Sequence, residues 1–370
     1  MHIHIPYILV TAFDVLALAA TIGALSCRIW VVSPDTTQIL HKRLWYWLGI
    51  SLFMLIVSSF VLFIGRTAEM SQQPLSTVWA LLPAVARQTQ FGHIWLMRLP
   101  VLAVLVILWF VGRRSTHGNT VPTLMLIGLM IIAFTRSATG HPADEGQFTA
   151  PEWIDWLHLL SISVWVGTLL AMIVSVFPTL RHTAISPPLI AQTTTRLSRL
   201  SAAALTIILI TGVLSAYHYL MHWDNLWLTD YGRILIVKLV FVAGAIALGA
   251  TNRFVYVPRI VTWAHHRTAH EPNAASKTVI NQALRPLMYA IGCEVSILMA
   301  ALLAASVLLH GMPPRDMANS DMASLSPSQT ITAQRPVGAT LLSVSFNTRI
   351  MILNRTDKKS VALDFRRSTT

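Results

Sequence analysis

Charged residues are scarce in this chain. Only 11% of its 370 residues are Asp, Glu, Lys or Arg, whereas 54% are hydrophobic. A soluble globular domain carries about a quarter charged residues, so the composition excludes an ordinary soluble enzyme and a nucleic-acid-binding tail protein. The mean hydropathy of +0.61 instead predicts a protein whose main partner is a lipid bilayer.

Cysteine and acidic residues are also few. The two cysteines, Cys27 and Cys293, lie inside apolar runs, and no CxxC pair exists. A disulfide framework is therefore excluded, and any metal site has to be built mainly from His, Met and carboxylate groups. The 27 basic residues exceed the 15 acidic ones. They lie in short loops between apolar runs, as in membrane proteins, so we expect no nucleic-acid partner.

Eight apolar runs approach or exceed the roughly 20 residues that a membrane-spanning helix needs. They cover approximately 7–31, 44–65, 94–112, 120–136, 153–178, 200–222, 232–252 and 287–309. The run 78–86 is too short to span and contains Pro83, so we expect it at the interface or re-entering the membrane. The chain is predicted to be an all-α integral membrane protein with eight transmembrane helices.

The loops between these runs alternate in charge. Four of them are basic, and they carry Lys42, Arg43, Arg113, Arg114, Arg181, Arg196, Arg199, Arg253, Arg259, Arg267, Lys277 and Arg285. The other loops are poorer in basic residues, and two hold the acids Asp144, Glu145, Glu152, Asp224 and Asp230. The positive-inside rule then predicts cytoplasmic basic loops and both termini outside.

An internal repeat divides the spans into two halves. The pattern aromatic-Gly-x-Ile-x-apolar-x-basic-Leu opens span three at 91–99 and span seven at 231–239. Span one also resembles span five when Asp14 is laid on His158, which brings Gly23 onto Gly167. Four helices separate the matches, so the sequence predicts two parallel four-helix halves, 1–136 and 137–314, related by an axis along the membrane normal.

Ionisable residues inside the spans form a second candidate feature. They are Asp14, Arg98, His158, Lys238 and Glu294, and such residues are costly in a membrane and mark functional sites. Helix geometry places four of them in one outer layer and Glu294 near the midplane. In a purely structural interpretation, Asp14 forms an ion pair with Lys238 or Arg98.

Histidine is concentrated on the predicted outer side. His2 and His4 share one face of an extended segment, His141 ends span four, and His158 lies about one turn into span five. Imidazole suits copper and zinc. We predict a metal site from His141 and His158, which would face one outer cavity, with His2 and His4 as further ligands.

The second half resembles the copper-resistance protein D (CopD/PcoD) family of bacterial inner-membrane proteins. The matching residues are His141, Leu157-His158-Leu159, Trp165-Val166-Gly167, Thr211-Gly212, Thr229–Arg233, Lys238-Leu239, Asn252-Arg253, Pro258, Glu294 and Pro313-Pro314. The resemblance implies copper homeostasis, with copper moving from periplasm towards cytoplasm and a CopC-like periplasmic partner. By position it carries over His141, His158, Trp165, Tyr231, Lys238 and Glu294.

Two other functions stay open on the sequence. One is a b-type membrane cytochrome with a single outer haem, because His158 has no histidine counterpart in the inner half. The other is a sensor or buffer of periplasmic copper that transports nothing. No P-loop or phosphorylated-Asp motif is evident, so we expect a carrier rather than an enzyme.

The C-terminal segment differs from the rest in composition. Residues 315–370 are polar and are too few for the fused CopC-like domain of some relatives. Residues 340–347 and 349–353 could pair as a hairpin, which is marginal in water by itself. We expect a largely disordered periplasmic tail.

Overall fold

The computed structural model forms two compact units, Met1–Gly311 and Met312–Thr370. It describes residues 5–33, 36–71, 75–113, 118–140, 148–182, 186–270, 277–311, 313–315, 317, 329–337 and 340–348. Eight helices among these residues are long and apolar enough to cross a membrane, and all belong to the first unit. The predicted all-α membrane protein with eight spans is confirmed.

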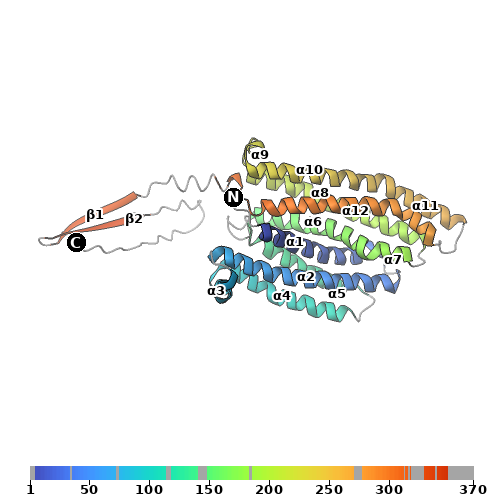
Figure 1. The fold of residues 1–370 in the computed structure, drawn as a ribbon, viewed down its shortest axis with the longest axis horizontal. Coiled ribbons are helices and arrows are strands. Elements are labelled where there is room, and N and C mark those ends of the chain that lie inside the picture. The colour runs from blue at the N-terminus through green and yellow to red at the C-terminus, as the bar shows by residue number, and fades with distance from the viewer. Residues whose placement is uncertain are drawn as a thin grey trace. The chain divides into compact units, whose positions relative to one another are not determined.

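The spanning helices alternate in direction through the bundle (Figure 1). They are α1 (Ile5–Ser26), α2 (Gln38–Ser71), α4 (Gln90–Gly112), α5 (Thr120–Ser137), α6 (Ala150–Ala171), α8 (Pro187–Leu220), α10 (Asp230–Thr251) and α12 (Lys277–Leu308). The predicted interfacial run 78–86 belongs to a separate helix, α3 (Leu75–Gln88), between α2 and α4. Because direction alternates, all four basic loops lie at one end of the bundle.

That basic end carries the extensions of two spans. Helices α7 (Phe177–His182) and α11 (Val257–His270) prolong α6 and α10 there, whereas α9 (Asn225–Leu228) lies at the opposite end (Figure 1). A π-helical turn occurs near the basic end of spans one, five and seven, as η1 (Cys27–Val31), η3 (Met172–Val176) and η4 (Asn252–Tyr256). Such turns are rare and often occur at functional sites.

Helices α1 and α6 form the centre of the bundle. In their most apolar windows, 78% and 61% of the residues are buried, against 11% in span seven. The two helices meet at glycines: a Cβ added to Gly23 would lie 1.9 Å from the carbonyl carbon of Gly167. Because the repeat relates these two glycines, their mutual contact is what a two-fold axis along the membrane normal requires.

The second repeat match forms the same cap twice. Thr89 Oγ1 accepts a hydrogen bond from the Gly92 amide at 2.9 Å, and Thr229 Oγ1 accepts one from the Gly232 amide at 3.0 Å. A Cβ at either glycine would lie within 2.2 Å of a carbonyl oxygen of the preceding short helix. Only glycine fits this close approach, which explains the shared motif.

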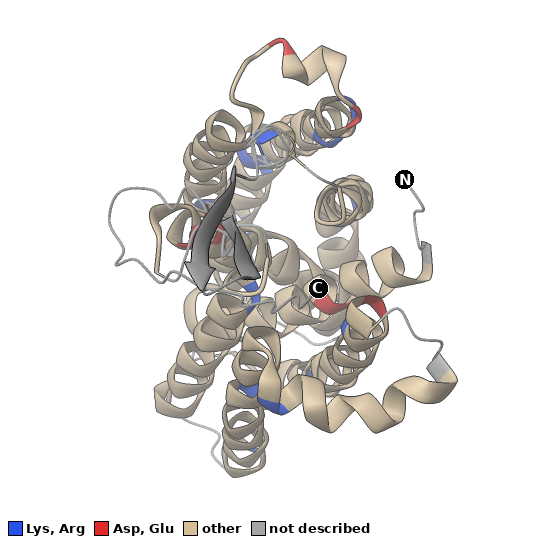
Figure 2. Ribbon diagram, turned by 90° about the vertical axis from the view of Figure 1, so that its left-hand side faces the viewer, with Lys and Arg blue, Asp and Glu red and all other residues tan. Residues whose placement is uncertain are grey.

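The outer faces of the bundle are apolar. Phe53, Ile107, Val213 and Val240 remain between 60% and 66% exposed. Viewed along the helices, most of the ribbon is uncharged, with Lys, Arg, Asp and Glu at scattered positions (Figure 2). In water, a continuous apolar surface of this kind would drive association, whereas lipid tails satisfy it.

The second unit contains one antiparallel hairpin. Strand β1 (Gln329–Val337) pairs with β2 (Thr340–Thr348), in a register that places Gln329 opposite Thr348. The predicted pairing of 340–347 with 349–353 is therefore wrong: 340–348 pairs with the segment before it. The alternation Thr330-Ile331-Thr332 suits a strand, and only two residues separate the strands, as in common hairpins.

Candidate functional site

His158 lies on α6 and bonds to a threonine on the neighbouring α8. The distance from His158 Nδ1 to Thr211 Oγ1 is 2.8 Å. The Thr211 hydroxyl donates to the Ile207 carbonyl oxygen at 2.7 Å, so its oxygen accepts from His158 Nδ1–H. This arrangement favours the tautomer with the proton on Nδ1. In that tautomer Nε2 carries no proton, which is the form in which an imidazole binds a metal.

Two charged residues lie near this imidazole. Lys238 on α10 interacts electrostatically with both His158 and Asp155. Asp155 precedes His158 by three residues, so both lie on one face of α6, and its carboxylate accepts a hydrogen bond from Ser137 on α5. The second half of the bundle thus combines an imidazole, a carboxylate and an ammonium group toward the end where α6 begins.

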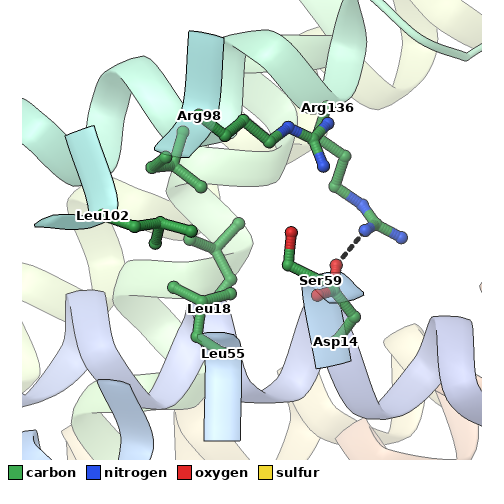
Figure 3. A pocket seen from close by; sticks show the side chains of 8 residues that line it. Asp14, Leu18, Leu55, Ser59, Arg98, Leu102 and Arg136 are labelled. Carbon is green, nitrogen blue, oxygen red and sulfur yellow. Dashed lines mark hydrogen bonds and ion pairs between the residues drawn. The ribbon is translucent and has the colours of Figure 1, made fainter. Parts of the chain in front are cut away.

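Asp14 takes the corresponding place in the first half. Ser58 on α2 donates to Asp14 Oδ1 at 2.7 Å, just as Thr211 on α8 holds His158. The other oxygen, Oδ2, forms an ion pair with Arg136 on α5 (Figure 3). The predicted pairing of Asp14 with Lys238 or Arg98 is therefore wrong. Depth along a helix does not reveal which cation faces Asp14, and α5 packs directly against α1.

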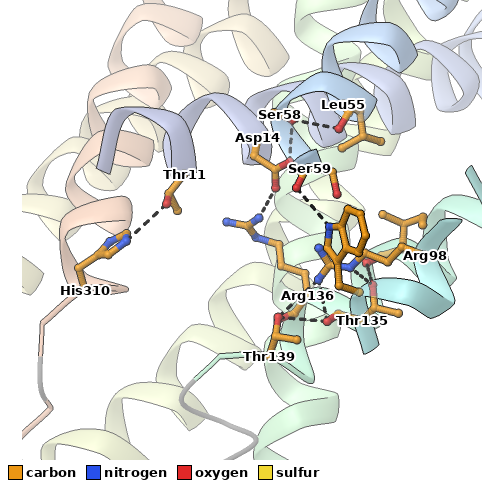
Figure 4. A network of polar contacts seen from close by, with 12 residues as sticks. Thr11, Asp14, Leu55, Ser58, Ser59, Arg98, Thr135, Arg136, Thr139 and His310 are labelled. Atoms are coloured by element: carbon orange, nitrogen blue, oxygen red, sulfur yellow. Dashed lines mark hydrogen bonds and ion pairs between the residues drawn. The ribbon is translucent and has the colours of Figure 1, made fainter. Parts of the chain in front are cut away.

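Arg98 on α4 points into the same part of the bundle. It is only 7% exposed, and it donates from Nε to Thr135 Oγ1 at 2.7 Å and from Nη2 to the Thr135 carbonyl oxygen at 2.9 Å (Figure 4). Arg98, Arg136 and Asp14 line a small cavity with room for about one water molecule (Figure 3). The first-half counterpart of the His158 site is thus occupied by an arginine–aspartate pair.

Glu294 on α12 forms a third polar cluster. Its Oε1 accepts from Trp165 Nε1 at 3.0 Å, and its Oε2 accepts from Asn252 Nδ2 at 2.6 Å. Trp165 follows His158 by seven residues, which is two turns or about 10.5 Å along the same face of α6. The Glu294 cluster therefore lies below the His158 site, deeper in the membrane.

The predicted site residues separate into three groups. His158 lies with Lys238, Asp14 with Arg98, and Trp165 with Glu294. Tyr231 lies in the first turn of α10. His2, His4 and His141 lie outside the described residues. Within the described ranges, no group of three or more His, Cys, Asp or Glu side chains is arranged to hold a metal ion.

Four residues of these clusters were missed in the sequence: Arg136, Asp155, Thr211 and Asn252. Arg136 and Asp155 lie at or just inside the ends of predicted spans, where a charged residue is ordinary. Asp155 was the easier to find, because it precedes His158 by one helical turn. Thr211 and Asn252 belong to the family-like motifs, but nothing in the sequence says which side chain each one contacts.

Two family models match the chain. Residues 2–150 match the model "Copper resistance protein D-like, N-terminal domain", and residues 191–309 match "Copper resistance protein D". Together they cover well over half of the chain, and residues 151–190 lie between the two matches.

Three curated relatives are similar. Copper transport protein CutJ of Bacillus subtilis (strain 168) is 31% identical over 47% of this chain, which is 33% of the relative. Copper resistance protein D of Pseudomonas syringae pv. tomato is 27% identical over 61% of this chain and 67% of its own length. Inner membrane protein YebZ of Escherichia coli (strain K12) is 26% identical over 47% of this chain and 57% of its own length. The matched part thus spans only a third of the Bacillus relative.

No solved structure matches the chain. The eight apolar helices and the inner-membrane relatives make it a multi-pass inner-membrane protein. The two family models and the relatives named for copper resistance and copper transport lead to one conclusion. The chain belongs to the copper resistance protein D family.

Proposed function

We propose that this protein carries copper across the inner membrane, from the periplasm towards the cytoplasm, with His158 as the entry ligand. The observation that supports this most directly is the hydrogen bond between His158 Nδ1 and Thr211 Oγ1, which orients the imidazole and leaves Nε2 as the nitrogen that would bind copper. Copper in either common oxidation state accepts imidazole ligands. His141, and more distantly His2 and His4, would complete the site.

The direction follows from charge placement. Basic side chains gather at the end of the bundle that carries α7 and α11, and the positive-inside rule assigns that end to the cytoplasm. His158 then opens toward the periplasm, together with both termini. A CopC-like periplasmic protein is the partner that would deliver copper to this side.

The route inward runs through the second half. His158 and Lys238 lie at its outer level, and Trp165, Glu294 and Asn252 lie below them. Near the basic end, Arg253 donates to the Ser198 carbonyl oxygen at 3.1 Å. In the first half, the position that corresponds to His158 is occupied by the Asp14–Arg136 ion pair. That half therefore serves as a scaffold.

The test compares Thr211→Val with Thr206→Val. Thr206 lies on the same helix, is exposed, and bonds only to its own helix backbone, through the Ala202 carbonyl oxygen. Loss of the residue that orients a metal-binding histidine lowers metal affinity by about 10- to 100-fold. We expect that loss for copper in Thr211→Val, no loss in Thr206→Val, and no outer-site binding in His158→Ala.

Two measurements separate the competing functions. Copper entry into sealed vesicles that contain only this protein would support a carrier over a sensor or buffer. A haem absorption band in the purified protein that disappears in His158→Ala would support the cytochrome instead. Equal copper affinity in Thr211→Val and Thr206→Val would contradict the proposed role of His158.

A further inference from the structure

We infer that Glu294 and Asn252 form a proton-binding site, whose loading and unloading accompanies copper movement. The inference rests on the proposed transport function for its role, although proton binding can be tested separately. It assigns Glu294 to a proton rather than to copper, because two oxygen atoms and an indole N–H are poor ligands for a soft metal.

The carboxylate has polar partners but no counter-charge. Glu294 is only 2% exposed, and its two donors, the Trp165 indole and the Asn252 amide, are neutral. The titratable and charged residues with described side chains on the elements packed against α12 are Tyr7, Asp14, Glu152, Asp155, His158, Arg181, Asp230, Tyr231, Arg233, Lys238, Arg253, Tyr256, Arg259, His265, His266 and Arg267. In the described part of the chain, none of them pairs with Glu294.

The nearest cations along α12, α10 and η4 are engaged or distant. On α12, Arg285 precedes Glu294 by nine residues, about 13.5 Å along the helix, and its guanidinium lies over the Tyr289 ring. Arg253 follows Asn252 directly, but its guanidinium donates to the backbone and side-chain oxygens of Ser198. Lys238 precedes Asn252 by 14 residues, which is about 21 Å along the helix. Burying a carboxylate without a cation is costly, so a proton is the simplest way to remove its charge.

The Asn252 side chain can form a hydrogen bond with Glu294 in both protonation states of the carboxyl group. It is 8% exposed, and its Oδ1 is buried without a hydrogen-bond partner while Nδ2 donates to Glu294. A half-turn of the amide exchanges the two atoms. When Glu294 takes a proton from water and forms a carboxylic O–H, Oδ1 can then accept that hydrogen. The same pair of side chains thus satisfies the charged and the neutral acid.

The backbone beside the carboxylate has two notable features. Gly249 lies beside the carboxylate, and a Cβ there would be 3.4 Å from Glu294 Oε1. Asn252 also begins the π-helical turn η4, a local irregularity typical of functional positions. Ionised Glu294 would attract a copper cation inward from His158, and protonation would remove that attraction.

Infrared difference spectroscopy of the reconstituted protein tests proton binding without copper. We expect acidification to produce the carbonyl band of a protonated carboxylic acid in wild type and in the exposed control Glu69→Gln. The band should be absent in Glu294→Gln and shifted in Asn252→Leu. A wild-type spectrum that matches Glu294→Gln at every pH at which the protein stays folded would overturn the inference. So would a Glu294 band that never changes with pH, or one that responds to sodium rather than to pH.

Copper uptake under an imposed pH gradient tests the coupling. Wild-type uptake should change with the gradient, whereas Glu294→Gln should bind copper at the outer site with unchanged affinity and lose that dependence. Gradient-independent uptake by wild type would refute coupling. If no copper enters at all, the transport proposal fails, while the infrared result still decides whether Glu294 binds a proton.

Discussion

Individual buried charges are handled differently in the two halves of this bundle. In the first half, Asp14 is neutralised by Arg136 and held by Ser58. In the second half, His158 is held by its hydrogen bond to Thr211, and Glu294 has only neutral donors. The Asp14–Arg136 ion pair stabilises the fold. Among the described residues, His158 and Glu294 have no counter-ion, so they remain available to a ligand or a proton.

The Asp14–Arg136 pair is expected to be strongly coupled. Removing one partner of a buried ion pair costs about 3–5 kcal/mol, because the other charge is left uncompensated. We therefore expect Asp14→Asn and Arg136→Met each to lower the unfolding free energy in detergent, and the double variant to lose less than the sum. The control cycle of Asp14→Asn with Lys238→Met should be additive. Additive losses for Asp14 and Arg136 would show that they do not pair.

The buried charged residues could be predicted from the sequence, but their partners could not. Asp14, Arg98 and Glu294 were singled out because charged groups within apolar runs are expensive, and all three are buried. Their partners were not predictable. Arg98, Arg136 and Lys238 all lie in the outer parts of their spans, as Asp14 does. Rotation of each helix about its own axis decides which one faces it.

At the scale of helices, glycines at positions related by the repeat allow close contacts between helix backbones. Gly23 and Gly167 allow α1 and α6 to cross with their backbones touching, and the Thr–Gly caps allow α4 and α10 to begin against a short preceding helix. The cap motif was visible in the sequence because close backbone approach demands glycine. The weaker match of span one to span five gains its support from the contact between the two glycines.

Gly167 should tolerate no side chain. A Cβ there would lie 1.8 Å from the Ala19 carbonyl oxygen, so Gly167→Ala has to push the two central helices apart. Overpacking of this kind costs about 1–3 kcal/mol or more, which we expect as a lower melting temperature and a lower yield of folded protein. Gly292→Ala on α12 is the control, because its Cβ would meet nothing within 4 Å. Equal stability of the two variants would contradict the helix crossing.

At the scale of the whole molecule, topology in the membrane can be measured with single cysteines. In a background of Cys27→Ser and Cys293→Ser, we expect a membrane-impermeant thiol reagent to label Asp224→Cys in intact spheroplasts. The exposed His265→Cys on α11 should be labelled only after permeabilisation, because the basic end is expected in the cytoplasm. The reverse labelling pattern would invert the proposed direction of copper movement.

Some properties of this protein were determined by its sequence alone. These properties are the eight spans, the charge asymmetry of the loops and the family motifs. Each depends only on the order of residues along the chain, and none depends on how the helices are rotated against one another. The tertiary structure alone decided that Arg136 neutralises Asp14, that Thr211 bonds to His158, and that Asn252 bonds to Glu294. Those contacts join helices far apart in sequence, and they depend on which helices are neighbours and which face each one turns inward.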